Sequence, residues 1–135
     1  MNIAFFLTPK NEVVFEELNA TMRQALERME YHRYTAIPIL NDKGKYVGTL
    51  TEGDLLWKLK NTEGLEFKNT TKVLISDIFM HMVNNPVHID SDIEDLVATS
   101  ITQNFIPVID DNDIFIGMIK RSDIITYCYK RLFQK

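Results

Sequence analysis

The stretch AIPILNDKGKYVGTLTEGDLL, residues 36–56, decides the fold, because the chain repeats its pattern as FIPVIDDNDIFIGMIKRSDII at residues 105–125. The two stretches align without a gap at an offset of 69 residues. Positions that carry the same residue in both copies include Pro38 and Pro107, Asp42 and Asp111, Gly48 and Gly117, and Asp54 and Asp123. An internal repeat of this kind indicates two copies of one structural unit.

Each copy predicts the order helix, strand, strand, helix. Apolar residues at helical spacing mark the first helix, and they are Met22, Ala25, Leu26 and Met29 in one copy and Ile93, Leu96, Val97 and Ile101 in the other. The capping-box patterns Thr21-x-x-Gln24 and Ser91-x-x-Glu94 predict where these helices begin. Two short apolar strands then form a hairpin across a polar turn, at residues 37–40 and 46–50 and again at 106–109 and 114–119. A second helix follows each hairpin.

One such copy is too small to bury its own sheet well, so we expect the two copies to pack sheet to sheet. The predicted fold class is therefore α/β (α+β), with two pseudo-symmetric repeats in one compact module. We place the first repeat at residues 1–63 and the second at residues 77–135. The polar, glycine-containing segment at residues 64–76 is the expected connector.

The composition is that of an ordinary soluble globular protein, with 45% hydrophobic and 25% charged residues. A net charge of −4 gives no electrostatic footprint for DNA or RNA. The single cysteine, Cys128, excludes an intramolecular disulfide. The N-terminus lacks the pattern of a signal peptide, and no apolar run approaches the ~20 residues of a membrane span. These features predict a cytoplasmic protein.

The segment GTLTEGD, residues 48–54, joins a strand to the start of a helix and carries two polar side chains, Thr51 and Asp54. An aspartate has two acceptor oxygens and can take hydrogen bonds from both hydroxyls of a ribose. The amides and dipole of the first helical turn favour an anion such as phosphate. The same two residues also make an ordinary helix cap. Without the duplication, the residues alone favour the cap.

The ordered segments YTAIPIL…GTLTEGDLL and NFIPVID…GMIKRSDII, with the leaders FFLTPKNEV and DIFMHMVNNPVHI, resemble a tandem pair of CBS domains, also called a Bateman module. The resemblance covers roughly residues 3–133. It implies a regulatory module that binds adenosine-containing ligands in clefts between the two copies and forms a homodimer. The combination of YTAIP with a basic pair after the second strand also resembles small stand-alone bacterial CBS proteins that bind AMP or cyclic di-AMP.

The resemblance implies two nucleotide sites, each assembled from both copies. The favoured first site consists of Thr8, Lys10, Val13, Tyr34, Thr35, Ala36, Lys120, Arg121, Ser122 and Asp123. In it Asp123 would hold the ribose, while the small residues at 35 and 36 leave room for a purine. Lys120 departs from the usual Ser or Thr of the motif and, with Arg121 and Lys10, predicts a basic mouth for phosphate. The alternative for Lys120 and Arg121 is simple solvated surface.

The second implied site, which is less favoured, consists of His81, Pro86, Asn104, Phe105, Thr51, Gly53 and Asp54. Its ribose and phosphate half is well formed. In its purine half, however, Phe105 stands where the first copy has Ala36. A phenylalanine there would either fill the slot or stack on a base, and filling is favoured because buried aromatic side chains usually pack.

The sequence thus predicts an adenine-nucleotide sensor for AMP, ADP, ATP or cyclic di-AMP, which signals to an unknown effector protein by conformational change. The alternative is a ligand-independent dimerisation or protein-interaction module. No pairing of nucleophile and base suggests an enzyme. The three histidines, His32, His81 and His88, lack ligand spacing and a carboxylate cluster, so we expect neither a metal nor a cofactor. Trp57 is expected to pack in the core.

Overall fold

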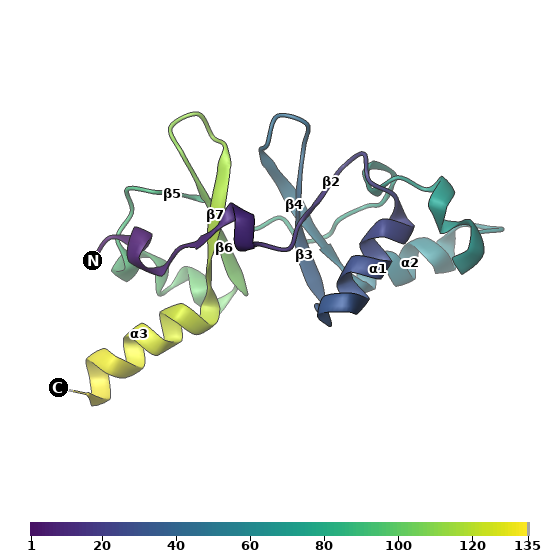
Figure 1. Ribbon diagram of the computed structural model, residues 1–135. Helices are drawn as coiled ribbons and strands as arrows, with labels where there is room; N and C mark the ends of the chain where they lie inside the picture. Colours follow the sequence, from purple (N-terminus) through teal and green to yellow (C-terminus); the bar gives the residue numbers. More distant parts are fainter. Residues whose placement is uncertain (135) are drawn as a thin grey trace. The chain divides into compact units, whose positions relative to one another are not determined.

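The computed structural model describes residues 1–134 and divides into two compact units, which are described separately (Figure 1). Unit 1 combines Met1–Val13 with the chain from Asn84 onward, and unit 2 is Val14–Val83. Each unit holds one copy of the duplicated hairpin and the helix that follows it. The leader of the first repeat, residues 1–13, belongs to the unit that contains the second hairpin. The compact units are therefore not the two continuous stretches of the sequence repeat.

Unit 2 contains a three-stranded sheet in the order β2 (Glu16–Glu17), β3 (Ala36–Leu40) and β4 (Tyr46–Thr51). The β3–β4 pair is the antiparallel hairpin that the sequence predicts, and β2 runs parallel to β3. The turn is stabilised by Asn41, whose side-chain oxygen accepts hydrogen bonds from the backbone N–H groups of Lys43 and Lys45 at 3.0 and 2.9 Å. An asparagine in this position replaces backbone partners that a tight turn leaves unpaired.

Two α-helices accompany this sheet, α1 (Met22–His32) and α2 (Glu52–Asn61) (Figure 1). The predicted capping box at the start of α1 is confirmed, since Thr21 and Gln24 each accept a hydrogen bond from the other's backbone N–H. The expected connector contains two short 3-10 helices, η3 (Phe67–Lys72) and η4 (Ile75–Asp77). It packs on α1, where the Arg23 guanidinium lies 3.9 Å from the centroid of the Phe67 ring.

The core of unit 2 consists of apolar side chains from α1, the hairpin, α2 and the connector, and its buried members are Met22, Ala25, Met29, Ile37, Ile39, Leu50, Leu55, Ile75 and Ile78. The three predicted residues of the first helix that are fully or almost fully buried, Met22, Ala25 and Met29, recur at helical spacing. Fully burying a side chain such as Leu50 contributes about 1.5–3 kcal/mol. The periodicity in the sequence therefore identified the buried face.

Unit 1 contains a four-stranded sheet in the order β1 (Thr8–Pro9), β7 (Phe115–Lys120), β6 (Phe105–Ile109) and β5 (Val87–His88). The β6–β7 hairpin leads directly into α3 (Arg121–Phe133), which ends near the C-terminus (Figure 1). The short 3-10 helices η1 (Ile3–Phe6) and η2 (Lys10–Glu12) flank β1. The main cluster of buried apolar side chains in this unit consists of Ile3, Ile93, Leu96, Ile106, Val108, Ile119 and Ile124.

The first helix predicted for the second copy is wrong in type. The chain there forms two 3-10 segments, η5 (Ile93–Leu96) and η6 (Thr99–Ile101), and the expected capping box from Ser91 to Glu94 does not form. Glu94 has other partners: its carboxylate accepts a hydrogen bond from the Tyr127 hydroxyl at 2.6 Å and contacts the N-terminal amine. The hydrogen bond from Tyr127 is the main reason that the pKa of Glu94 is lowered to about 2.

The glycines shared by the two repeats, Gly48 and Gly117, lie where a leader segment crosses the second strand of the hairpin. A Cβ atom on Gly117 would lie 2.3 Å from the backbone oxygen of Thr8, and one on Gly48 would lie 3.0 Å from the Met80 side chain. The repeat therefore keeps glycine here because the neighbouring chain occupies the space of a side chain. Among the described residues, no helix has the length and apolarity that crossing a membrane requires.

We predict that Gly117→Ala lowers the free energy of unfolding by about 1–3 kcal/mol, because the new methyl group would collide with the backbone of β1. Gly53→Ala is the matched control, since its Cβ would meet no atom closer than 3.6 Å and alanine favours helix. Urea denaturation of the two variants measures the difference. Equal stability of the two variants would contradict the close approach of β1 and β7.

Candidate functional site

The strand-to-helix segment of unit 2 forms a complete capping box around Asp54. Thr51 Oγ1 accepts a hydrogen bond from the Asp54 N–H at 3.1 Å, and Asp54 Oδ2 accepts one from the Thr51 N–H at 3.0 Å. The other carboxylate oxygen, Oδ1, lies 2.6 Å from His81 Nδ1 and also accepts from the His81 backbone N–H at 3.3 Å. The Asp54 side chain is fully buried. This carboxylate is therefore already well supplied with donors from its own unit.

The residues around this cap also define a pocket in unit 2. It has a volume of about 430 Å³ and is lined by Asp54, Trp57, Lys58, Asn61, Thr62, Asp77 and Phe79. The Trp57 side chain does not pack in the core as expected, because it is 49% exposed and its ring lies edge-on to His81 with centroids 5.5 Å apart. Gly53, which precedes Asp54, leaves room beside the Trp57 ring.

The equivalent segment of unit 1 is built differently. Lys120 is the N-cap residue of α3, and its side chain makes no capping hydrogen bond. Asp123 is half-buried, and within residues 1–134 its carboxylate has no hydrogen bond or ion pair. It borders a pocket of about 340 Å³ whose lining residues are Met1, Phe6, Asp123, Thr126, Tyr127 and Lys130. Four of these are the repeat equivalents of residues that line the Asp54 pocket.

Arg121 has a structural role that its motif position does not reveal. Its Nε donates hydrogen bonds to the backbone oxygens of Ser100 and Gln103, at 2.8 and 3.2 Å, and its own N–H donates to the Asn104 oxygen at 3.1 Å. The guanidinium thus closes the η6 segment onto the start of α3. Ser122, by contrast, is exposed, as is Lys120. Of the predicted basic pair, Lys120 is the residue that faces solvent.

The leader residues of the first predicted site all lie in unit 1, close to the hairpin that ends at Lys120. Thr8 pairs with Met118 in the β1–β7 ladder. Lys10 begins η2 and is half-buried, while Val13 is buried and 7% exposed. The structure thus assembles Thr8 and Val13 with the strand that leads to Asp123 in one unit.

The segment before β3, which the resemblance assigns to the purine, lies in unit 2. Tyr34 is 48% exposed and stacks on His32 with ring centroids 5.5 Å apart. Thr35 is exposed, and its backbone oxygen accepts a hydrogen bond from the Glu52 N–H at 3.0 Å. Ala36 begins β3 opposite Thr51. Thr35 is thus exposed and Ala36 is half-buried at the start of the strand.

Phe105 is buried, and whether it fills the purine slot or stacks on a base stays a prediction. Its backbone oxygen accepts hydrogen bonds from the side-chain amides of Asn84, at 3.1 Å, and Gln103, at 3.4 Å. Both amide residues, Asn84 and Gln103, are buried, and neither is among the predicted site residues. Pro86 and Asn104 of the second predicted site are exposed. The signal in the sequence is a side-chain amide a few residues before an apolar strand, as Gln103 is before β6, which can donate to a backbone oxygen of that strand.

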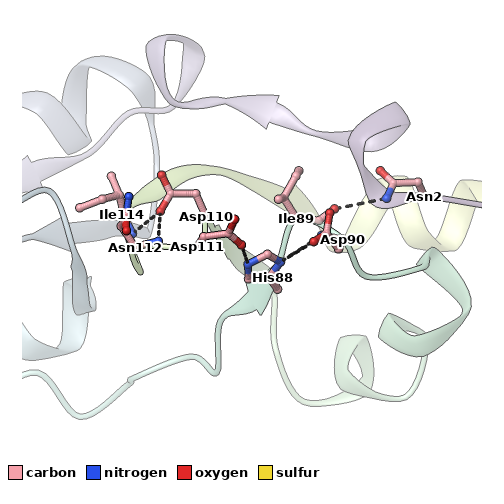
Figure 2. Close-up of polar contacts among 8 residues, drawn as sticks. All are labelled: Asn2, His88, Ile89, Asp90, Asp110, Asp111, Asn112 and Ile114. Carbon is pink, nitrogen blue, oxygen red and sulfur yellow. Dashed lines mark hydrogen bonds and ion pairs between the residues drawn. The ribbon is translucent and has the colours of Figure 1, made fainter.

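The expectation that the histidines have no carboxylate cluster beside them is wrong for His88. Figure 2 shows the His88 ring between two aspartates, with Nδ1 3.3 Å from Asp90 Oδ2 and Nε2 2.6 Å from Asp111 Oδ1. These contacts connect the end of β5 with the β6–β7 turn, which Asp110 caps by accepting two backbone hydrogen bonds. The three side chains are of metal-ligating types and lie within 4.8 Å of one another, so the absence of a metal stays a prediction.

The chain matches a known protein family over most of its length. The sequence profile of the CBS domain matches the chain twice, at residues 7–61 and 75–130. The chain belongs to the CBS domain family. The two matches contain the two copies of the duplicated hairpin, which confirms the tandem pair inferred from the repeat.

One curated relative of this CBS pair is an uncharacterized protein of Methanopyrus kandleri. The two proteins are 25% identical over 118 residues, which amount to 86% of this chain and 58% of the relative. The CBS pair thus spans a little over half the length of that relative.

Solved structures with the same fold include the CbpB protein of Listeria monocytogenes in complex with cyclic di-AMP. That structure has a TM-score of 0.81 and 17% identity, with 98% of both chains covered. CBSX2 in complex with AMP has a TM-score of 0.73 and 20% identity, covering 96% of this chain and 97% of its own. CBSX2 of Arabidopsis thaliana has a TM-score of 0.76 and 18% identity, covering 96% and 95%. At these identities the likeness confirms the fold of a CBS pair.

The different surroundings of the two motif aspartates predict different effects on stability. Asp54→Ala removes a buried carboxylate that caps α2 and accepts three hydrogen bonds. We therefore expect it to lower the free energy of unfolding by about 1–3 kcal/mol. Asp123→Ala should change that free energy by less than about 0.5 kcal/mol. Urea denaturation without nucleotide measures both. A larger loss for Asp123→Ala would contradict the arrangement described.

Proposed function

We propose that the chain is a regulatory CBS pair that binds an adenine nucleotide and signals its ligand state to a partner protein by conformational change. The ligand class is AMP, ADP, ATP or cyclic di-AMP. Two observations support this class: solved CBS pairs of the same fold hold cyclic di-AMP or AMP, and this chain carries the duplicated strand-to-helix element with its aspartates. The proposed activity is binding rather than catalysis.

The observation that carries the choice of site is the open carboxylate of Asp123. A ribose diol needs acceptor oxygens that are not already used, because each hydrogen bond lost by the protein must be replaced by the ligand. Asp54 accepts three hydrogen bonds within unit 2, whereas Asp123 accepts none from the described residues. We therefore assign the ribose to Asp123, in the first of the two sites.

The rest of the proposed site follows from exposure and charge. Lys120, the N-cap residue of α3, and Ser122, in the first turn of α3, are exposed and would contact phosphate, with Thr8 and Lys10 contributed by the leader. Arg121 shapes this turn through its contacts with backbone oxygens. For the purine we propose the backbone of Thr35 and Ala36, with Val13 and Tyr34 as apolar neighbours.

Signalling requires that the ligand bind one conformation more tightly than another, since a ligand with equal affinity for both shifts nothing. We propose a cytoplasmic homodimer as the form that is read by the partner. Support for self-association comes from the helices, because α2 and α3 expose large apolar side chains: Leu56, Ile125, Tyr129 and Leu132. The alternative, a ligand-independent interaction module, would use the same surfaces.

Nucleotide binding is tested by thermal denaturation and titration calorimetry of the chain with AMP, ADP, ATP and cyclic di-AMP. A true ligand at 100 times its dissociation constant should raise the free energy of unfolding by ~2.7 kcal/mol. We expect Asp123→Ala to weaken binding about 10- to 100-fold, the cost of a lost hydrogen bond to a charged group. Asp54→Ala, the repeat-matched control, should weaken it far less.

Two results would overturn this proposal in different ways. No stabilisation by any of the four nucleotides or by S-adenosylmethionine would favour the interaction module. A larger loss of affinity for Asp54→Ala than for Asp123→Ala would refute the choice of site while leaving nucleotide binding intact.

We predict that Lys120 discriminates between ligands by their phosphate charge. Lys120→Ala should lower the affinity for ATP several-fold more than the affinity for AMP, because the lost attraction grows with the number of charges on the ligand. Lys43→Ala, in the exposed β3–β4 turn, is the matched control and should leave both affinities unchanged. Calorimetric dissociation constants at low and high salt measure the effect. Equal losses for ATP and AMP would show that Lys120 does not discriminate between ligands by their phosphate charge.

A further inference from the structure

We infer that His81 selects which of the two motif aspartates binds nucleotide, because its imidazole ring occupies the Asp54 carboxylate that a ribose would need. This inference rests on the proposed function, in which a motif aspartate holds the ribose diol. It goes further, because it explains why Asp54 would not bind a ribose. The cause is one side chain, His81, which belongs to neither the duplicated hairpin nor the helix after it.

The contact has the geometry of a strong hydrogen bond. His81 Nδ1 lies 2.6 Å from Asp54 Oδ1, shorter than an ordinary N–H···O bond. A carboxylate offers about four acceptor positions, and three of those on Asp54 are used, two of them by His81. A ribose diol would therefore have to displace the ring before it could form two hydrogen bonds with this carboxylate.

The ring is also far more exposed than the carboxylate that it contacts. The His81 side chain is 42% exposed, whereas the Asp54 side chain is 0% exposed. Trp57, from the next turn of α2, lies edge-on against the same ring. The imidazole is thus fixed from two sides, by Asp54 and by Trp57, in the position that separates the carboxylate from solvent.

The other repeat has no such ring. Thr49 and Met118 are equivalent positions, and each is crossed by a leader, at Met82 in unit 2 and at Thr8 in unit 1. The residue before the crossing is His81 in unit 2 and Leu7 in unit 1. Leucine has no donor, and Asp123 keeps its carboxylate without a partner among the described residues. The two repeats therefore differ at the aspartate because their leaders differ.

Removing the ring leaves the cap in place. In His81→Ala, Asp54 retains the Thr51 N–H and the backbone N–H of residue 81, so the variant is expected to fold. Titration calorimetry with AMP should give one nucleotide bound per wild-type chain and two per His81→Ala chain, which requires that Phe105 stack on the base in the second site instead of filling the slot. His81→Gln, which restores a side-chain donor, should bind one. His88→Ala, the matched control from unit 1, should also bind one.

The double variant His81→Ala with Asp54→Ala identifies the new site, and it should bind one AMP again. A stoichiometry of one for His81→Ala, or of two for the wild-type chain or for the double variant, would overturn the inference. A wild-type chain that binds no AMP or other adenine nucleotide would instead refute the proposed function. Circular dichroism of each variant checks that the fold is retained.

Discussion

The pairing of each leader segment with the second strand of a hairpin is the constraint on which the rest of this protein depends. In unit 1, Thr8 and Pro9 pair with Met118 and Gly117, and in unit 2 the Thr49 N–H donates to the Met82 oxygen at 2.9 Å. The approach is so close that the hairpin strand carries glycine at the crossing. Backbone packing thus explains Gly117, while the side chain of Met80 lies against the equivalent Gly48.

This crossing brings a residue of the leader to the start of the following helix, where the motif aspartate lies. In unit 2 that residue is His81, which donates to Asp54, and in unit 1 no donor reaches Asp123 from the described residues. The two strand-to-helix elements share their glycine and their aspartate but differ in chemistry. One has a buried, fully engaged carboxylate that stabilises its helix, and the other has an open carboxylate suited to a ligand.

Short-range patterns in the sequence were reliable where local interactions decide the structure. The hairpins, α2, α3 and the capping box at Thr21 depend on residues within a few positions of one another. The first helix of the second repeat was wrong because Glu94 bonds to Tyr127, 33 residues away, instead of to Ser91. The expectation that Trp57 packs in the core was wrong for the same reason, since its partner His81 is distant in the chain.

The sequence by itself determined the duplication, the two hairpins with the helices that follow them, and the two motif aspartates, Asp54 and Asp123. Only the tertiary structure decided which unit each leader joins, and hence that His81 faces Asp54 while Asp123 keeps an unused carboxylate. The physical reason is that periodicity and capping are local properties. A hydrogen bond between residues 27 positions apart depends on how the chain folds back on itself.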